Sequence, residues 1–495
     1  MYIKNRWLIL AIVTSTLFLI IIDMTVLYTA LPDLSQALNV TASEKLWIIN
    51  TYPLMVASLL PGAGMLSDRI GHKTLFMAGL PTFGIASLCA AYSPSAEYLI
   101  ASRALLAVGA TMMMPATLAI VRHVFTDAQE RSIAIGIWSA VASGAAALGP
   151  VLGGLLLEYF WWGSVFLLNV PVIMAIFPCA RMLIPQGKCN PQRPCDLIGS
   201  LFIMLGLIGV IYALKELSKA NQSRPALLMA LAIGSLFLAL FVRRQKRAIQ
   251  PMLDFSLFRN QPFTSAVVIA VISMMALTGI ELVLTQRLQL VLGLSPLMAG
   301  LTILPLPVAS ALAAPLAGMI LPRYGSARLL SGGLILTMLG IIALSLLFKG
   351  DLLPQLFALF LIGFGLGGTF TAVSASIMLN TPEENAGMIA AIEDVSWEMG
   401  GVLGVTLLGG LMTAIYSRIL ILPESLSNRL SVYDSLDEAL RVARRLDSYH
   451  SGLLIELANK AFDQAVMCVL IASAILITVS IVALKRVLRK QRPLT

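Results

Sequence analysis

The chain has 495 residues, of which 58% are hydrophobic and only 12% are charged, and its net charge is +9. This composition lies far outside that of soluble globular domains and indicates a polytopic membrane protein. Lys and Arg fall mainly in short segments between apolar runs, and no basic patch is interleaved with aromatic residues, so the charge does not indicate nucleic-acid binding.

Apolar runs of about 20 residues are long enough to cross roughly 30 Å of hydrocarbon as helices. Fourteen such runs cover residues 7–30, 44–66, 74–92, 98–121, 132–158, 164–184, 197–217, 224–242, 262–286, 297–320, 327–348, 354–379, 386–414 and 463–484. The first run contains Asp23 and lacks a small-x-small cleavage site, so we expect a retained span rather than a signal peptide. The fold class predicted is an all-α polytopic membrane protein.

The positive charges predict the orientation of these spans. On one side of the membrane the short segments carry only Lys45, Lys215, Lys219, Arg224, Arg287 and Lys349, and most other Lys and Arg residues fall on the opposite side. Short cytoplasmic segments are enriched in Lys and Arg. Because the number of spans is even, we expect both termini in the cytoplasm.

An internal repeat predicts the domain organisation. The segment Gly64–Gly71 has an echo at Gly318–Gly325, and the spans 197–217 and 224–242 fall between the two copies. We therefore expect a six-helix bundle over 1–184, two inserted helices over 185–248, and a second six-helix bundle over 249–495. The second copy has Pro322 in place of Asp68 and Leu361 in place of Arg103, which suggests that the halves divide their roles.

The fifth span contains glycines and a proline that would destabilise a soluble helix. These residues are Gly144, Gly149, Pro150, Gly153 and Gly154. Gly costs about 1 kcal/mol and Pro about 3 kcal/mol in a helix interior, whereas small residues in membrane helices allow close helix approach. The run is either an ordinary packing face or part of a transport motif.

Ionisable side chains inside the spans are the main candidates for function. A charge at the bilayer centre costs at least about 2.5 kcal/mol and persists when it is paired, hydrated or functional. The candidates for proton coupling and cation binding are Asp23, Arg103, Glu281, Glu393, Asp394 and Glu398. At about 1.5 Å per residue, Asp23 lies about 24 Å above the inner end of its span, and Arg103 about 9 Å below the outer end of its span, so their depths coincide.

The thirteenth span carries three acids within six residues. Asp394 and Glu398 are four residues apart and share a helix face, whereas Glu393 and Trp397 share another face about 100° away. Two carboxylates that repel each other in a low dielectric predict that at least one binds a proton near neutral pH. Proton and cation would then compete for one site. Glu393 could instead reach the cytoplasmic interface, and Glu281 could be interfacial.

Aromatic and methionine side chains suggest the walls of a cavity. Tyr28, Trp138 and Trp397 could offer faces for cation–π contacts, and Met112–Met114 an adaptable apolar wall. Ordinary packing and contact with lipid are the alternatives.

The loop GMLSDRIGHK, Gly64–Lys73, could latch the cytoplasmic gate through Gly64, Asp68, Arg69, Gly71 and Lys73, or be merely a solvated charged loop. It resembles the signature of the major facilitator superfamily, although His72 stands where the family usually has Arg. IDMTVLYTALP (22–32), PMLDFSLFRNQPF (251–263) and LGLSPLMAGLTILP (292–305) resemble motifs of its fourteen-span drug:proton antiporters. Residues 144–154 likewise resemble the antiporter motif of this family, and Arg103 with Gly109 resembles its fourth-span motif for proton handling.

This resemblance implies a proton-coupled multidrug efflux antiporter of the bacterial inner membrane, working as a monomer by alternating access. The implied substrates are lipophilic mono- and dications, namely quaternary ammonium compounds, biguanide antiseptics, dyes and methyl viologen. The proton gradient would supply the energy without a cofactor, and no phosphate-binding G-x-x-x-x-G-K motif is present. The alternatives are a proton-coupled exporter of a metabolite such as an amino acid, peptide or siderophore, and a passive channel or receptor.

Two further segments complete the prediction. Residues 415–462 are too long for an ordinary connection and have helical spacing, so we expect an outer helical hairpin turning at Ser448–Gly452, which could cover the exit. Among the cysteines Cys89, Cys179, Cys189, Cys195 and Cys468, only Cys189 and Cys195 lie close in sequence. They fall in a predicted cytoplasmic loop without a nearby His, so neither a disulfide nor a zinc site is expected.

Overall fold

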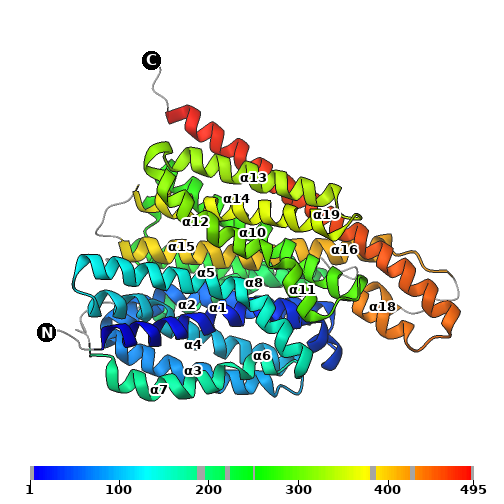
Figure 1. Ribbon diagram of the computed structural model, residues 1–495, viewed down its shortest axis with the longest axis horizontal. Helices are drawn as coiled ribbons and strands as arrows, with labels where there is room; N and C mark the ends of the chain where they lie inside the picture. The colour runs from blue at the N-terminus through cyan, green and yellow to red at the C-terminus, as the bar shows by residue number, and fades with distance from the viewer. Residues whose placement is uncertain are drawn as a thin grey trace.

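The computed structural model describes residues 5–186, 196–217, 223–248, 251–379, 386–423 and 430–491. Every regular element in these ranges is a helix, and fourteen helices are long and apolar enough to cross a membrane, as predicted (Figure 1). In Figure 1, α1 begins and α19 ends toward the same, left-hand end of the molecule. We call this the inner end, because its loops carry most of the Lys and Arg residues.

The first six spans form the N-terminal bundle. They are α1 (Arg6–Ala37), α2 (Ala42–Ile70), α3 (His72–Ala91), α4 (Ala96–Val124), α5 (Ala128–Tyr159), and α6 (Ser164–Leu167) continued by α7 (Asn169–Leu183). Side-chain caps mark the starts of α2, α4 and α5. Thr41 and Glu44 form a reciprocal capping box on α2, while Ser95 and Asp127 cap α4 and α5.

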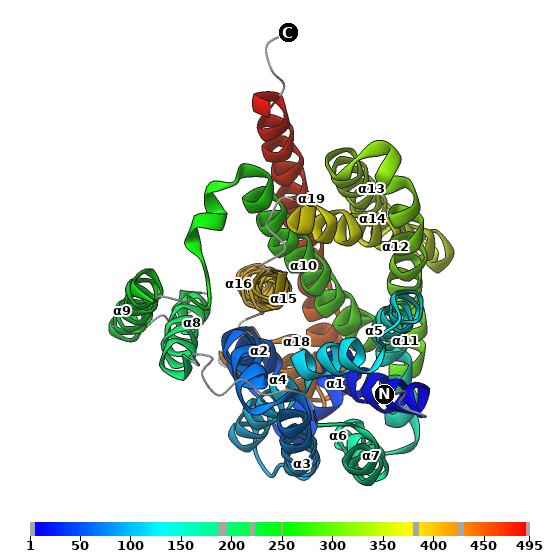
Figure 2. The ribbon, with the colours of Figure 1, turned by 90° about the vertical axis from the view of Figure 1, so that its left-hand side faces the viewer.

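Two inserted helices, α8 (Leu197–Leu217) and α9 (Arg224–Arg247), follow the N-terminal bundle. Helix α8 packs on α2, and α9 packs on α8 at the edge of the molecule (Figure 2). Only 11% of the most apolar stretch of α9 is buried within the protein. This apolar surface therefore faces lipid.

The last six spans form the C-terminal bundle, which begins after the short helix η1 (Phe255–Arg259). Three of its spans are single helices, namely α13 (Ser326–Leu346), α14 (Leu352–Leu379) and α19 (Ser448–Gln491). The other three are composite. One is α10 (Gln261–Gln286) followed by the π-turn η2 (Arg287–Val291), one is α11 (Pro296–Ile303) followed by α12 (Pro305–Tyr324), and one is α15 (Ala386–Leu403) followed by the π-turn η4 (Gly404–Gly409) and α16 (Gly410–Ile419). One apolar core fills each bundle, and a small third cluster of Leu54, Ile211 and Val402 joins α2, α8 and α15.

The repeat seen in the sequence is also present in the backbone. Gly71 links α2 to α3 with φ of 97°, and Gly325 links α12 to α13 with φ of 76°. Residues other than glycine rarely adopt this left-handed backbone conformation. The loop expected over Gly64–Lys73 is therefore reduced to a turn at Gly71, because residues 64–70 form the last turns of α2 and His72 begins α3, and the same turn recurs at Gly325 in the second half.

The outer hairpin differs from the prediction. It consists of η5 (Leu430–Tyr433), α18 (Leu436–Ala443) and the start of α19, and it projects at the right-hand end of Figure 1. The chain turns between α18 and Ser448, so the turn expected at Ser448–Gly452 is wrong, and these residues lie inside α19. The cause is Asp447, which accepts a hydrogen bond from the backbone N–H of His450 and starts a helix of 44 residues that continues through the last span.

Candidate functional site

Asp23 of α1 and Arg103 of α4 form a completely buried ion pair. The Nη1 of Arg103 lies 2.6 Å from Oδ2 of Asp23, and the two side chains are 1% and 0% exposed. Their depths were predicted to coincide, and the structure brings the two groups into contact. Because an isolated charge at this depth would be very costly, each group stabilises the charged form of the other.

The surroundings of this pair belong to the N-terminal bundle. Arg103 donates from Nε to the carbonyl of Ile48 (3.3 Å) and stacks on the Tyr52 ring at 4.7 Å. Asn169 of α7 donates to Oδ1 of Asp23 (3.4 Å) and to Oγ of Ser87 (3.1 Å). The pair thus ties four spans together, and any change in its protonation would be felt by α1, α2, α4 and α7.

The acids of α15 lie on two faces of the helix, because successive residues are rotated by 100° about its axis. Gly400 faces α10, where a Cβ would lie 2.7 Å from Cβ of Met274, and Val402 faces α2 and α8 through Leu54 and Ile211. Asp394 and Glu398 point between these two directions. Figure 2 shows α15 near the centre of the molecule, with α2 on one side and α10 on the other.

Asp394 is exposed although it lies in a central helix, and Glu398 and Glu281 are half-buried. Glu281 and Glu398 both lie within electrostatic range of the Tyr28 hydroxyl on α1, and Glu398 also of Tyr52. The carboxylates of α10 and α15 therefore approach one wall of the N-terminal bundle. Beyond Glu281, α10 continues to Gln286 and then through η2, and the alternative that Glu281 is interfacial stays a prediction.

Glu393 does not reach the cytoplasmic interface, and that alternative is wrong. It is 8% exposed and accepts hydrogen bonds from Oγ of Ser374 on α14 and from Nε1 of Trp397. Trp397 in turn packs edge-on against Phe370, with ring centroids 4.7 Å apart. Glu393 and Trp397 therefore face the interior of the C-terminal bundle, as their separation of about 100° from Asp394 and Glu398 requires.

The other aromatic candidates lie on the N-terminal bundle. Trp138 of α5 donates to Oγ1 of Thr117 on α4 (3.2 Å), and Tyr28 is half-buried on α1. No contact among the described residues joins Tyr28, Trp138 and Trp397, so a shared aromatic pocket stays a prediction. Met113 is buried in the N-terminal core, whereas Met112 and Met114 are half-buried.

The glycines of α5 mark close helix contacts. A Cβ on Gly149 would lie 2.8 Å from Cβ of Thr25 on α1, and a Cβ on Gly154 would lie 2.5 Å from Cα of Leu297 on α11. A Cβ on Gly153 would clash with Cγ2 of Val26 on α1, and a Cβ on Gly300 of α11 would clash with the carbonyl oxygen of Pro150. Bare backbone is thus required where α5 crosses to the C-terminal bundle. Gly144, nearer the inner end, has open space around it.

The predicted gate loop lies at the inner end of α2 and α3. Nδ1 of His72 lies 2.8 Å from Oγ of Ser67, and Nε2 of His72 lies 3.9 Å from Oδ1 of Asp68. Nζ of Lys73 donates to the carbonyl of Arg181 at the end of α7 (2.9 Å). Gly64 has open space around it, and Arg69 is exposed. These contacts lie within the N-terminal bundle, and the gating role of the loop stays a prediction.

Polar contacts close the outer half of the molecule between the two bundles. Asn50 of α2 donates to Oγ1 of Thr406 in η4 (2.7 Å), and Gln289 in η2 donates to the carbonyl of Thr29 (3.0 Å). Lys45 of α2 pairs with Asp437 of the hairpin, and both side chains are nearly inaccessible. The structure is therefore closed toward the outside.

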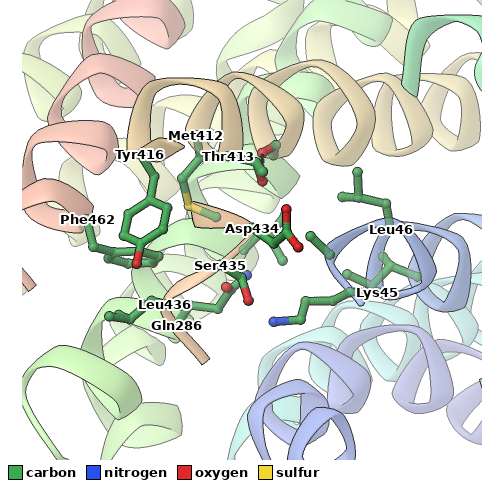
Figure 3. A pocket seen from close by; sticks show the side chains of 14 residues that line it. Lys45, Leu46, Gln286, Met412, Thr413, Tyr416, Asp434, Ser435, Leu436 and Phe462 are labelled. Atoms are coloured by element: carbon green, nitrogen blue, oxygen red, sulfur yellow. Dashed lines mark hydrogen bonds between the residues drawn. The ribbon is translucent and has the colours of Figure 1, made fainter. Parts of the chain in front are cut away.

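The Lys45–Asp437 pair was not found from the sequence, because its partners are 392 positions apart and Lys45 was counted only as an outer charge. It lies beside a small cavity of about 30 Å³ enclosed by α2, α10, α16, the hairpin and α19 (Figure 3). Figure 3 shows Lys45 approaching from α2, opposite Tyr416 and Phe462. A second missed pair joins Arg287 in η2 to Asp463 of α19 at 2.8 Å.

Among the described residues, no group of three or more His, Cys, Asp or Glu side chains could hold a metal ion. Cys89, Cys179 and Cys468 are free thiols. Cys189 and Cys195 lie outside the described residues, so the expectation about them is not addressed by the structure.

Two six-span bundles, repeated turns and ionisable groups buried between spans define a membrane transporter. The family model for the Major Facilitator Superfamily matches residues 13–405. Methyl viologen resistance protein SmvA of Salmonella typhimurium strain LT2 is 37% identical over 461 residues, covering 92% of this chain and 93% of that protein. Multidrug efflux pump LfrA of Mycolicibacterium smegmatis is 35% identical, covering 96% of this chain and 94% of that protein.

The fold is likewise shared with a solved transporter. A bacterial homolog of the human lysosomal transporter Spinster, in an inward-facing and unoccupied conformation, superposes with a TM-score of 0.69 at 16% identity, covering 99% of each chain. The chain belongs to the major facilitator superfamily, as the sequence motifs predicted. It is a transporter integral to the bacterial inner membrane, and it is not an enzyme.

Proposed function

We propose that this transporter is a proton-coupled exporter of lipophilic cations, in which a cation and protons compete for the carboxylates between the bundles. The observation that supports the proposal is that Asp394 and Glu398 share one face of the central helix α15, with Asp394 exposed and with Glu281 and Glu398 both within electrostatic range of Tyr28. Apolar walls with carboxylates select cations, because a buried carboxylate without a counter-charge is expensive.

The two sets of charges would perform different tasks. Asp23 already has Arg103 as its counter-charge and is sealed from solvent, so a drug has no access to it in this state. Asp394 is exposed and has no cationic partner among the described residues. We therefore assign cation binding to Asp394, Glu398 and Glu281, and a proton-linked conformational role to the Asp23–Arg103 pair.

The outward-closed structure fits the loading step of export. A cation entering from the cytoplasm would displace protons from the acids of α15, and the bundles would then rock so that α5, α11 and the hairpin separate on the outer side. Protonation from outside would release the cation. Similarity to SmvA and LfrA, whose names describe methyl viologen resistance and multidrug efflux, supports this substrate class.

The test is transport by purified protein in proteoliposomes with a pH-sensitive dye trapped inside. Methyl viologen and a quaternary ammonium monocation should each move protons in the direction opposite to the drug, and Asp394→Asn with Glu398→Gln should abolish this exchange. The matched control is Asp351→Asn, which removes an exposed acid from the outer loop between α13 and α14. Proton movement driven only by amino acids or peptides would identify a metabolite exporter, and drug flux without proton movement would identify a passive pathway.

A further inference from the structure

A second cavity, separate from the proposed transport site, lies at the inner end of the molecule. It has a volume of about 360 Å³ and forms where the end of α2 meets the inserted helices. Its lining residues are Leu66, Arg69 and Ile70 of α2, Asp196, Leu197 and Ile198 at the start of α8, and Arg244 of α9. None of these residues contributes to the cation site between the bundles.

One wall of this cavity is fixed by a hydrogen-bond network. Oδ1 of Asp196 accepts from Nε of Arg244 at 2.7 Å, and Oδ2 accepts from Nε2 of Gln245 at 2.9 Å. Gln245 is 2% exposed and also accepts from the backbone N–H of Met252 at 2.8 Å. The guanidinium of Arg244 is thereby held at the cavity, and the charge of Asp196 is already matched.

The cavity retains a net positive charge. Arg69 lines the opposite wall, and no described residue forms a hydrogen bond or ion pair with it. Arg243, Lys246 and Arg247 follow on the exposed last turns of α9. Basic side chains clustered at the cytoplasmic membrane boundary attract anionic headgroups.

The remaining walls are apolar and open. Ile70, Leu197 and Ile198 are 40%, 58% and 51% exposed, although they lie at the ends of membrane-spanning helices. A soluble anion would gain nothing from these side chains, whereas the first carbons of an acyl chain would cover them. Charge and apolar surface together fit an amphiphile with an anionic head.

We propose that this cavity binds an anionic phospholipid, with its phosphate between Arg69 and Arg244 and its proximal acyl carbons on Leu197 and Ile198. The lipid would join the inserted helices to the inner end of α2, directly beside the gate loop that ends at Lys73. The second half supplies a comparison, because Arg323 ends α12 as Arg69 ends α2 but no inserted helix lies beside it.

The test is native mass spectrometry of the full-length protein titrated with phosphatidylglycerol or phosphatidylethanolamine. We expect tighter binding of phosphatidylglycerol, and about fivefold weaker binding for Arg69→Gln, in line with the contribution of one basic residue near an anionic surface. Arg69→Lys, which keeps the charge on the exposed wall and leaves the Asp196 network untouched, should retain most of the preference. Arg323→Gln is the matched control and should bind as the wild type does.

Each contrary result overturns the proposal. Equal binding of the two lipids, or an equal loss in Arg69→Gln and Arg323→Gln, would show that no specific site exists. Displacement of the lipid by stoichiometric glycerol phosphate would show that a free phosphate, rather than a lipid, is the ligand. Size-exclusion profiles identical to wild type are required of every variant, and Arg69→Met, which also removes the charge, maintains the test if Arg69→Gln fails to fold.

Discussion

The buried pair of Lys45 and Asp437 leads to a quantitative prediction about the outer gate. It joins α2 of the N-terminal bundle to the hairpin of the C-terminal bundle, and the two side chains are 7% and 3% exposed. The neighbouring contact from Arg441 to Oδ1 of Asn39 (2.7 Å) is exposed, so the buried pair is the stronger link. Outward opening must separate the pair.

Removing one partner of a buried ion pair costs about 3–5 kcal/mol, because the other charge stays buried without compensation. In Lys45→Met this penalty falls on the outward-closed state alone, since opening lets water reach Asp437. A cost of about 3 kcal/mol changes the ratio of closed to open molecules by about 100-fold. A population that is almost entirely closed in the wild type should therefore contain a large open fraction in the variant.

The assay is a distance measurement between spin labels at Tyr92→Cys and Leu353→Cys, in a chain without native cysteines. These exposed positions follow α3 and begin α14, at the outer ends of the two bundles. Lys45→Met should add a longer distance to the distribution. Asp447→Asn, an exposed hairpin acid paired with His450, is the control and should leave the distribution unchanged.

The exchanged pair, Lys45→Asp with Asp437→Lys, should restore part of the closed population that Lys45→Asp alone loses. If Lys45→Met leaves the distances unchanged, or if the exchanged pair behaves like Lys45→Asp, the pair does not hold the gate and the reasoning is refuted.

Four further predictions follow from the geometry. Asp23→Asn should abolish drug-driven proton exchange, and it should lower the unfolding temperature of the purified protein because Arg103 stays buried without a counter-charge at a cost of about 3 kcal/mol. Adding Arg103→Gln should recover the stability but not the exchange. An unaltered exchange rate in Asp23→Asn would refute the assignment. Gly154→Leu should reduce export strongly by holding α5 away from α11, and full export would make this contact ordinary packing. Asp394→Asn should weaken binding of dications more than of monocations, measured by fluorescence with both ligands, and equal losses would contradict its role as the second counter-charge. Burial raises the pKa of Asp434 beside the hairpin cavity, so its ionisation opposes closure above the ordinary carboxyl range. In the Lys45→Met background, where open molecules are populated, Asp434→Asn should add closed molecules at about pH 7 and none at about pH 4, and an equal effect at both would contradict this.

The spans and one buried pair were predictable because they depend on simple depth and hydropathy. Asp23 and Arg103 could be matched by counting about 1.5 Å per residue along two helices that the fold of the resembled family places side by side. Likewise, the glycines of α5 indicated close backbone contact, and Gly149 and Gly154 make it with Thr25 and Leu297.

The outer contacts were not predictable, because no local pattern encodes them. In the sequence nothing distinguishes Lys45 from the other charges on the outer side, because its partner Asp437 is brought to it only by the fold of α18. The hairpin turn was misplaced because Ser448 and Gly452 are typical turn residues, whereas the cap at Asp447 and the apolar residues after it favour a helix. Ser374, which holds Glu393 inside its bundle, is likewise set by tertiary packing of α14 on α15.

The most direct test of the central claim is proton release when a cation binds to purified protein in detergent. A weakly buffered sample near pH 7 is mixed with a quaternary ammonium compound, and the pH change is recorded for the wild type, Asp394→Asn, Glu398→Gln and the double variant. We expect proton release from the wild type, a smaller release from each single variant, and none from the double variant. Unchanged release from the double variant, or drug binding without any release from the wild type, would contradict competition between cation and proton at these carboxylates.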